Sequence, residues 1–126
     1  MSAAGVDKFI VHARKALLNG LSPEQNRTIP PLRYPVVYQL AQDFPGLELI
    51  INGGITSVKN IKQHMSHVNG VMIGRQAWNT PYLFAEIEEE IFNNPRVPSR
   101  TEVFDLYLGM TPTLPVLSSA SLTSLL

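Results

Sequence analysis

Short apolar runs alternate, between residues 7 and 94, with segments in which apolar residues recur at helical spacing. The runs Lys8–His12, Leu47–Asn52 and Gly70–Ile73 have the continuous apolar character of buried strands in a parallel sheet. The segments between and after them have the period of helices. This alternation predicts an α/β fold with a parallel sheet.

Three of the periodic segments predict amphipathic helices. Pro35 suits the first turn of one helix, Ser57 can cap a second, and Thr80 can cap a third. Their apolar stripes are expected to contain Val36, Val37, Leu40, Ala41, Val58, Ile61, Met65, Leu83, Ile87 and Ile91. Residues 13–33 are rich in turn-forming residues and predict a long polar loop.

The second and third predicted strands each run into a glycine turn, Gly53-Gly54 and Gly74. Glycine permits positive φ and a close approach of the backbone to a ligand, and a helix that opens at such a turn favours an anion. Consecutive glycine turns at the carboxyl ends of parallel strands match the phosphate site of (β/α)₈ barrels. Arg75 adds a side chain that can bind phosphate with two parallel hydrogen bonds. The sequence therefore predicts a phosphate site. Asn52, at the end of the second strand, offers a donor and an acceptor to a ligand, but it is equally suited to forming the turn.

Composition limits what this chain can do. Its 126 residues are enough for one domain but fall short of the ~250 residues typical of a complete barrel. The absence of cysteine excludes disulfides, thiolate metal sites and cysteine catalysis by the chain itself. The ten basic and ten acidic residues balance, and no apolar run approaches the ~20 residues of a membrane span. Within this balance, the segment from Lys8 to Arg33 is locally basic.

The histidines offer weaker signals. His12, at the end of a predicted strand, can donate to a phosphate or to an RNA group, but a lone histidine is more often structural. His64 and His67 are spaced so that one metal ion could bind both, yet no third ligand lies near them in the sequence. We therefore expect both to be surface residues and assign no metal.

Five runs of residues together point to a known family: His12–Ala16, Leu21–Arg27, Ile29–Leu32, Ile51–Ile55 and Gly70–Arg75. In order and spacing they closely resemble the tRNA-dihydrouridine synthases, subfamily A. The resemblance extends from about residue 7 to residue 108.

The resemblance implies an FMN-dependent TIM barrel, of which residues 7–94 would form about three carboxyl-terminal βα units. Residues 95–109 would be a linker and the start of a helical domain that clasps tRNA. Residues 110–126 carry no charge and are expected to be a disordered tail. The family uses reduced flavin, recharged by NADPH, to deliver hydride to a uridine of the tRNA D-loop, while a cysteine protonates the neighbouring carbon.

The same resemblance assigns roles to particular residues. Those implied to contact FMN are His12, Asn52, Gly53, Gly54, Gly74 and Arg75. Those implied to contact tRNA are Arg14, Lys15, Glu24 and Arg27. Arg27 is the best-matched tRNA contact, whereas Glu24 stands where many family members carry a lysine. No residue of this chain is assigned a catalytic role.

The family's cysteine, and the residues that hold the flavin ring, belong to the earlier half of the barrel. We therefore expect this chain to be a fragment that is inactive alone. Three strands cannot close a barrel, so the missing barrel half or self-association through open sheet edges is the expected partner besides tRNA. The expected location is the cytoplasm, or an organelle if the source is a plant or an alga.

Two alternatives remain open at this point. The first is another phosphate-binding barrel oxidoreductase that uses FMN, for which the basic loop would be dispensable for RNA contact. The second is a non-catalytic RNA-binding remnant, which would bind RNA without flavin.

Overall fold

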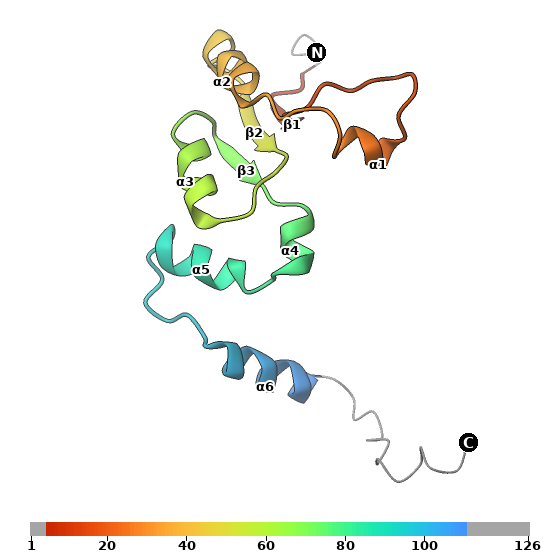
Figure 1. The fold of residues 1–126 in the computed structure, drawn as a ribbon. Coiled ribbons are helices and arrows are strands. Elements are labelled where there is room, and N and C mark those ends of the chain that lie inside the picture. The colour runs from red at the N-terminus through yellow and green to blue at the C-terminus, as the bar shows by residue number, and fades with distance from the viewer. Residues whose placement is uncertain (1–4, 111–126) are drawn as a thin grey trace, which may run out of the picture. The chain divides into compact units, whose positions relative to one another are not determined.

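The structure, a computed structural model, describes residues 5–110. The chain divides into two compact units, residues 1–95 and 96–126, which are described separately. Most of the expected tail, residues 111–126, lies outside the described residues. The helices and strands of the first unit (Figure 1) are β1 (Lys8–His12), α1 (Pro23–Asn26), α2 (Tyr34–Asp43), β2 (Glu48–Asn52), α3 (Val58–Met65), β3 (Gly70–Met72), α4 (Arg75–Asn79) and α5 (Leu83–Glu90).

The three predicted strands form one parallel sheet in the order β1-β2-β3. Val11 pairs with Ile51, and Ile51 pairs with Val71, so these residues share one face of the sheet. The α/β class is confirmed, and a small parallel sheet of this kind is consistent with part of a barrel.

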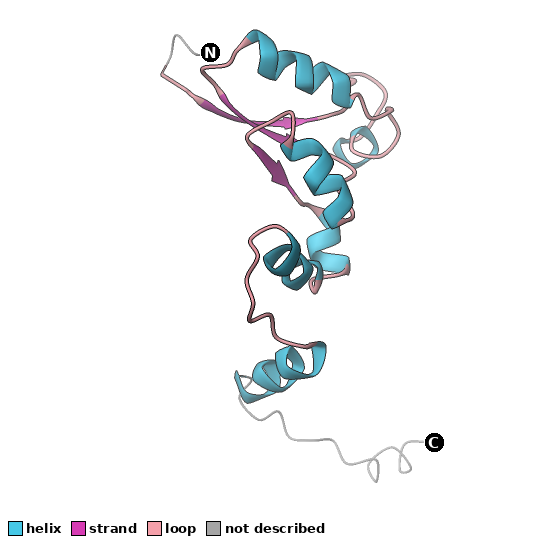
Figure 2. Ribbon diagram, turned by 90° about the vertical axis from the view of Figure 1, so that its left-hand side faces the viewer, coloured by secondary structure: helices cyan, strands magenta, loops and turns pink. Residues whose placement is uncertain are grey.

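One face of this sheet carries the core. Ile51 at the centre is completely buried and packs in a cluster with Ala13, Val37 and Val68. The helices α2 and α3 lie side by side against this face (Figure 2), where Tyr34 of α2 meets His64 of α3. The burial of apolar surface between these helices and β2 therefore stabilises the sheet.

The opposite face of the sheet is open within the described part of the chain. Ile10 is 58% exposed and Met72 is 43% exposed, and Lys8 forms an ion pair across this region with Glu48 at 2.9 Å. The sequence predicted a buried first strand, and this is wrong for Ile10. An apolar strand residue is buried only if another element covers its face, and no described element covers this one.

A second cluster joins α3 to α5. It consists of Ile55, Val58, Ile61, Leu83 and Ile87, which confirms four positions of the predicted stripes. Two positions are wrong, because Val36 is 52% exposed and Met65 is 46% exposed. On α3 the buried position that follows Ile61 belongs to His64.

The predicted helix starts are confirmed in part. Ser57 caps α3 by accepting a hydrogen bond from the Asn60 amide. Thr80 does not cap α5, which begins at Leu83 without a side-chain cap. The Thr80 amide instead donates to the Gln76 carbonyl and ends α4.

The described part of the second unit contains α6 (Arg100–Met110). A capping box opens this helix, because the Ser99 amide donates to the Glu102 carboxylate at 2.7 Å and the Glu102 amide donates to the Ser99 hydroxyl at 3.3 Å. These hydrogen bonds hold the pKa of Glu102 below its usual value. None of the helices in residues 5–110 is both long and apolar enough to cross a membrane.

Candidate functional site

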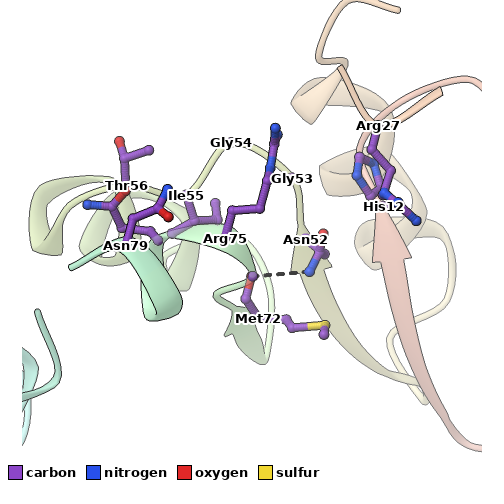
Figure 3. Close-up of a pocket in the computed structure, with 12 residues that line it drawn as sticks. His12, Arg27, Asn52, Gly53, Gly54, Ile55, Thr56, Met72, Arg75 and Asn79 are labelled. Carbon is purple, nitrogen blue, oxygen red and sulfur yellow. Dashed lines mark hydrogen bonds between the residues drawn. The ribbon is translucent and has the colours of Figure 1, made fainter. Parts of the chain in front are cut away.

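A pocket with a volume of about 440 Å³ lies at the carboxyl ends of the three strands. His12 ends β1, Asn52 ends β2, and Gly74 follows β3. The residues that line the pocket (Figure 3) are His12, Arg27, Asn52, Gly53, Gly54, Ile55, Thr56, Met72, Gly74, Arg75, Gln76 and Asn79. Both glycine turns thus border one pocket, as their position after parallel strands predicts.

The first glycine turn needs glycine for its conformation and for its space. Gly53 has φ +115° and Gly54 has φ +71°, in the range that other residues rarely adopt. A Cβ on Gly54 would lie 2.6 Å from Leu32 Cδ1, and a Cβ on Gly53 would lie 3.1 Å from His12 Cε1. The turn is therefore enclosed by side chains that belong to distant parts of the sequence.

The two turns lead into their helices differently. Gly74 directly precedes α4 without a side-chain cap, whereas α3 begins at Val58, four residues after Gly54. The prediction that each turn opens a helix is therefore wrong for the first. Since α4 has only five residues, its dipole contributes little to anion binding. The free backbone amides at the turns contribute more. None of the hydrogen bonds among residues 5–110 uses the amides of Gly53, Gly54 or Gly74.

The pocket is electrostatically positive. Arg27 and Arg75 line it together with His12, and none of the lining residues is acidic. Within the described part of the chain neither arginine has an acidic partner, so neither positive charge is neutralised by an ion pair there. Burial, and then the charges of Arg14, Arg27 and Arg75, lower the pKa of His12 from its usual 6.5. The part of this shift that comes from the arginines reflects a positive electrostatic potential at the pocket, which would favour a bound anion.

Arg27 reaches the pocket because the long loop after β1 is tied down at several points. The Asn26 side chain exchanges hydrogen bonds with the backbone of Leu17, at 2.7 and 2.9 Å. Arg14 Nε donates to the Pro30 carbonyl at 2.7 Å, and the Arg33 amide donates to the Ala13 carbonyl at 2.7 Å. The sequence separates Arg27 and Arg75 into two anion sites, and the structure places them around one pocket.

The other three residues with implied tRNA contacts do not line the pocket. Arg14 is half-buried, and its Nη1 has no hydrogen-bond partner among the described residues. Lys15 and Glu24 are exposed on the loop. Sequence reasoning also missed lining residues: Ile55, Thr56, Met72, Gln76 and Asn79. Their closeness to the glycine turns was the only signal that could have indicated them.

The expectation of two surface histidines is wrong for His64. Its side chain is only 2% exposed, and its Nδ1 lies 2.6 Å from the Tyr38 hydroxyl. Burial lowers its pKa, and His67 adds to this effect. His67 is exposed and stacks on Tyr38 with ring centroids 4.1 Å apart. Within residues 5–110 no group of three or more histidines and carboxylates is arranged to hold a metal ion.

The pocket fits a phosphate group on three grounds. Unused backbone amides border it at the glycine turns, two guanidinium groups line it, and its volume of about 440 Å³ falls in the usual range for small ligands. Parallel α/β proteins bind phosphate-containing ligands at this end of the sheet. The fold is thus that of an α/β protein, and its pocket has a lining that suits a phosphate-containing ligand.

Comparison with known proteins narrows this class. Residues 1–116 match the family described as dihydrouridine synthase (Dus), and the chain belongs to this family. Similar proteins include the tRNA-dihydrouridine(20/20a) synthase of Synechocystis sp., 57% identical over 106 residues that make up 83% of this chain and 32% of that protein. The enzyme of the same name from Vibrio parahaemolyticus is 51% identical over 102 residues, which are 80% of this chain and 31% of that protein.

The chain thus spans about a third of the length of these curated relatives. Membership of the family decides against the alternative of another barrel oxidoreductase.

Proposed function

We propose that this chain is the carboxyl-terminal part of the FMN-binding barrel of a tRNA-dihydrouridine synthase of subfamily A. The parent enzyme would reduce uridine in the tRNA D-loop, with NADPH as the reductant. The names of the relatives specify positions 20 and 20a, and we propose the same positions here. The observation that carries this proposal is the positive pocket between the two glycine turns.

In this proposal the chain's task is to hold the phosphate end of the cofactor. When bound, FMN supplies the hydride chemistry of the family. Arg75 would bind the phosphate through its guanidinium group, and the amides of Gly53, Gly54 and Gly74 would donate to its oxygens. Asn52, which donates weakly to the Met72 carbonyl at 3.4 Å, and His12 would contact the remainder of the cofactor.

The loop between β1 and α2 would form the tRNA side of the site. Arg27 stands at the border between the pocket and this loop, so it would contact a backbone phosphate of the tRNA. Lys15 and the position of Glu24 lie further out on the same loop. Arg14 holds the loop through Pro30, and its own contact with tRNA stays a prediction.

The open face of the sheet indicates what the chain would need for activity. Ile10 and Met72 on this face would pack inside a closed barrel, so the missing barrel half, or a second copy of the chain, is the proposed partner. Residues 7–94 would be the barrel part, and residues 95–109 the linker and first helix of the tRNA-clasping domain. We keep the cytoplasm as the proposed location, or an organelle for a plant or algal source.

The proposal predicts weak FMN binding by the chain alone. A charged hydrogen bond contributes about 1.5–3 kcal/mol and a neutral one about 0.5–1.5 kcal/mol. A few such contacts give roughly millimolar affinity, since 1 mM corresponds to about 4 kcal/mol.

The test is an FMN titration of the full chain, followed by NMR. Arg75→Ala should weaken binding at least tenfold, because it removes one charged contact. The control is Lys59→Ala, which removes an exposed cation of α3 outside this pocket. Equal effects of the two substitutions would contradict the proposed site, and submicromolar binding by the wild type would show that the affinity estimate is wrong.

A further inference from the structure

The first glycine turn is held from behind by a tyrosine. The Tyr34 hydroxyl, at the start of α2, donates to the Gly53 carbonyl at 2.8 Å. The same oxygen would lie 2.9 Å from a Cβ on Gly54, so it also leaves no room for a side chain at the second residue of the turn. We propose that Tyr34 is a positioning residue that orients the Gly53–Gly54 peptide for phosphate binding, an inference that rests on the proposed function.

The planarity of the peptide bond links this contact to the pocket. In a trans peptide the carbonyl oxygen and the next amide hydrogen point to opposite sides, and the described chain has no cis peptides. Tyr34 does not line the pocket, whereas Gly54 does. Holding the Gly53 carbonyl on the Tyr34 side therefore keeps the Gly54 amide on the opposite side, where it has no hydrogen-bond partner among residues 5–110.

Glycine makes such a support necessary. Gly53 and Gly54 have positive φ values, but glycine adopts φ of either sign with similar ease. The turn residues therefore do not fix the peptide plane by themselves. A hydrogen bond from a side chain that is itself fixed can select one orientation.

Tyr34 is fixed by His64, the histidine that the sequence predicted to lie on the surface. Its ring meets His64 edge to face, with centroids 4.4 Å apart and planes at 62°. His64 is 2% exposed and is held through its Nδ1 by the Tyr38 hydroxyl at 2.6 Å. Tyr38 thus holds His64, His64 packs against Tyr34, and Tyr34 holds the turn.

The experiment is an FMN titration of the full chain by ¹H–¹⁵N NMR, with Tyr34→Phe as the variant. This change removes the hydroxyl and keeps the ring against His64. A hydrogen bond worth about 0.5–1.5 kcal/mol corresponds to a twofold to tenfold loss of FMN affinity. The control is Tyr107→Phe, which removes the hydroxyl of an α6 tyrosine that is 64% exposed and does not line the pocket, and which should change the affinity less than twofold.

The Gly54 amide gives a readout that a purely structural role would not affect. The chemical shift of the Gly54 amide should change strongly when FMN binds to the wild type. It should change clearly less when FMN saturates the Tyr34→Phe variant. A loss of affinity below twofold, or an equal Gly54 shift in both proteins, would overturn the role of Tyr34. If the wild-type Gly54 amide did not shift at all, the proposed phosphate site itself would fail, which is a distinguishable result.

A second variant covers the case in which Tyr34→Phe does not fold. Replacing Tyr34 by 3,5-difluorotyrosine keeps the donor at low pH but makes the phenol more acidic, so that it loses its proton at a lower pH than Tyr34 itself, whose pKa is raised by burial. The FMN affinity relative to wild type at the same pH should fall as this phenol ionises. A ratio that stays constant across the titration would overturn the proposal.

Discussion

Gly54→Ala tests the crowded first glycine turn. The new methyl group would sit 2.6 Å from Leu32 Cδ1 and 2.9 Å from the Tyr34 hydroxyl oxygen, and the residue would keep φ +71°. A left-handed conformation costs a non-glycine residue about 1–2 kcal/mol, and overpacking costs about 1–3 kcal/mol. Because Leu32 Cδ1 ends a flexible side chain, movement of Leu32 relieves part of the clash, whereas displacing the Tyr34 hydroxyl costs its hydrogen bond to Gly53.

We expect Gly54→Ala to lower the free energy of unfolding by about 2–4 kcal/mol, after allowing about 0.4–1 kcal/mol for the reduced freedom of the unfolded chain. The control is Gly20→Ala, where φ is +89° but nothing lies within 4 Å of the Cβ position. It carries the backbone strain without the crowding, so it should cost about 0–1.5 kcal/mol.

Urea denaturation followed by far-ultraviolet circular dichroism measures both variants. A difference of about 2 kcal/mol moves the midpoint by roughly 1 M when the slope is about 2 kcal/mol per M. If the two variants agree within about 0.5 kcal/mol, the size of an ordinary surface effect, the turn is not enclosed as described.

Three further predictions concern charge and activity. The pKa of His12, followed by NMR, should lie below 6.5 because of burial and the nearby arginines. Just below pH 6.5 the unfolded chain then binds more protons than the folded chain, so the free energy of unfolding decreases as the pH is lowered. His12→Gln should make this decrease smaller. In a full-length parent, Arg27→Ala should flatten the salt dependence of tRNA affinity by about one phosphate contact, and an unchanged slope would remove Arg27 from the tRNA site. The chain alone, incubated with FMN, NADPH and unmodified tRNA, should form no dihydrouridine because it has no cysteine, and product above the no-protein control would contradict this.

The strands and the meeting of the two glycine turns could be predicted because they depend on local patterns. The apolar run Lys8–His12 matches β1 at both ends. Glycine turns after parallel strands must meet at one edge of the sheet, and they do. The short helix α1 was missed although its signal was present, since Ser22 and Gln25 form a capping box.

Burial and long-range hydrogen bonds could not be predicted in this way. His64 is polar and lies on a helix, and only the presence of Tyr38 from another helix makes its burial favourable. The hydrogen bond from Tyr34 to Gly53 spans 19 positions, so no local pattern indicates it. The exposure of Ile10 depends on whether anything covers the sheet, which the strand's own sequence does not state.

Phosphate binding by the two glycine turns is the part of the proposed function on which the rest depends. It can be measured by comparing ¹H–¹⁵N NMR spectra of the full chain with FMN and with riboflavin, which lacks the phosphate, at equal concentration. FMN should change the chemical shifts of the amides of Gly53, Gly54, Gly74 and Arg75. Riboflavin should leave these chemical shifts unchanged. Equal shifts with both flavins, or FMN shifts concentrated away from these four amides, would contradict phosphate binding at the turns.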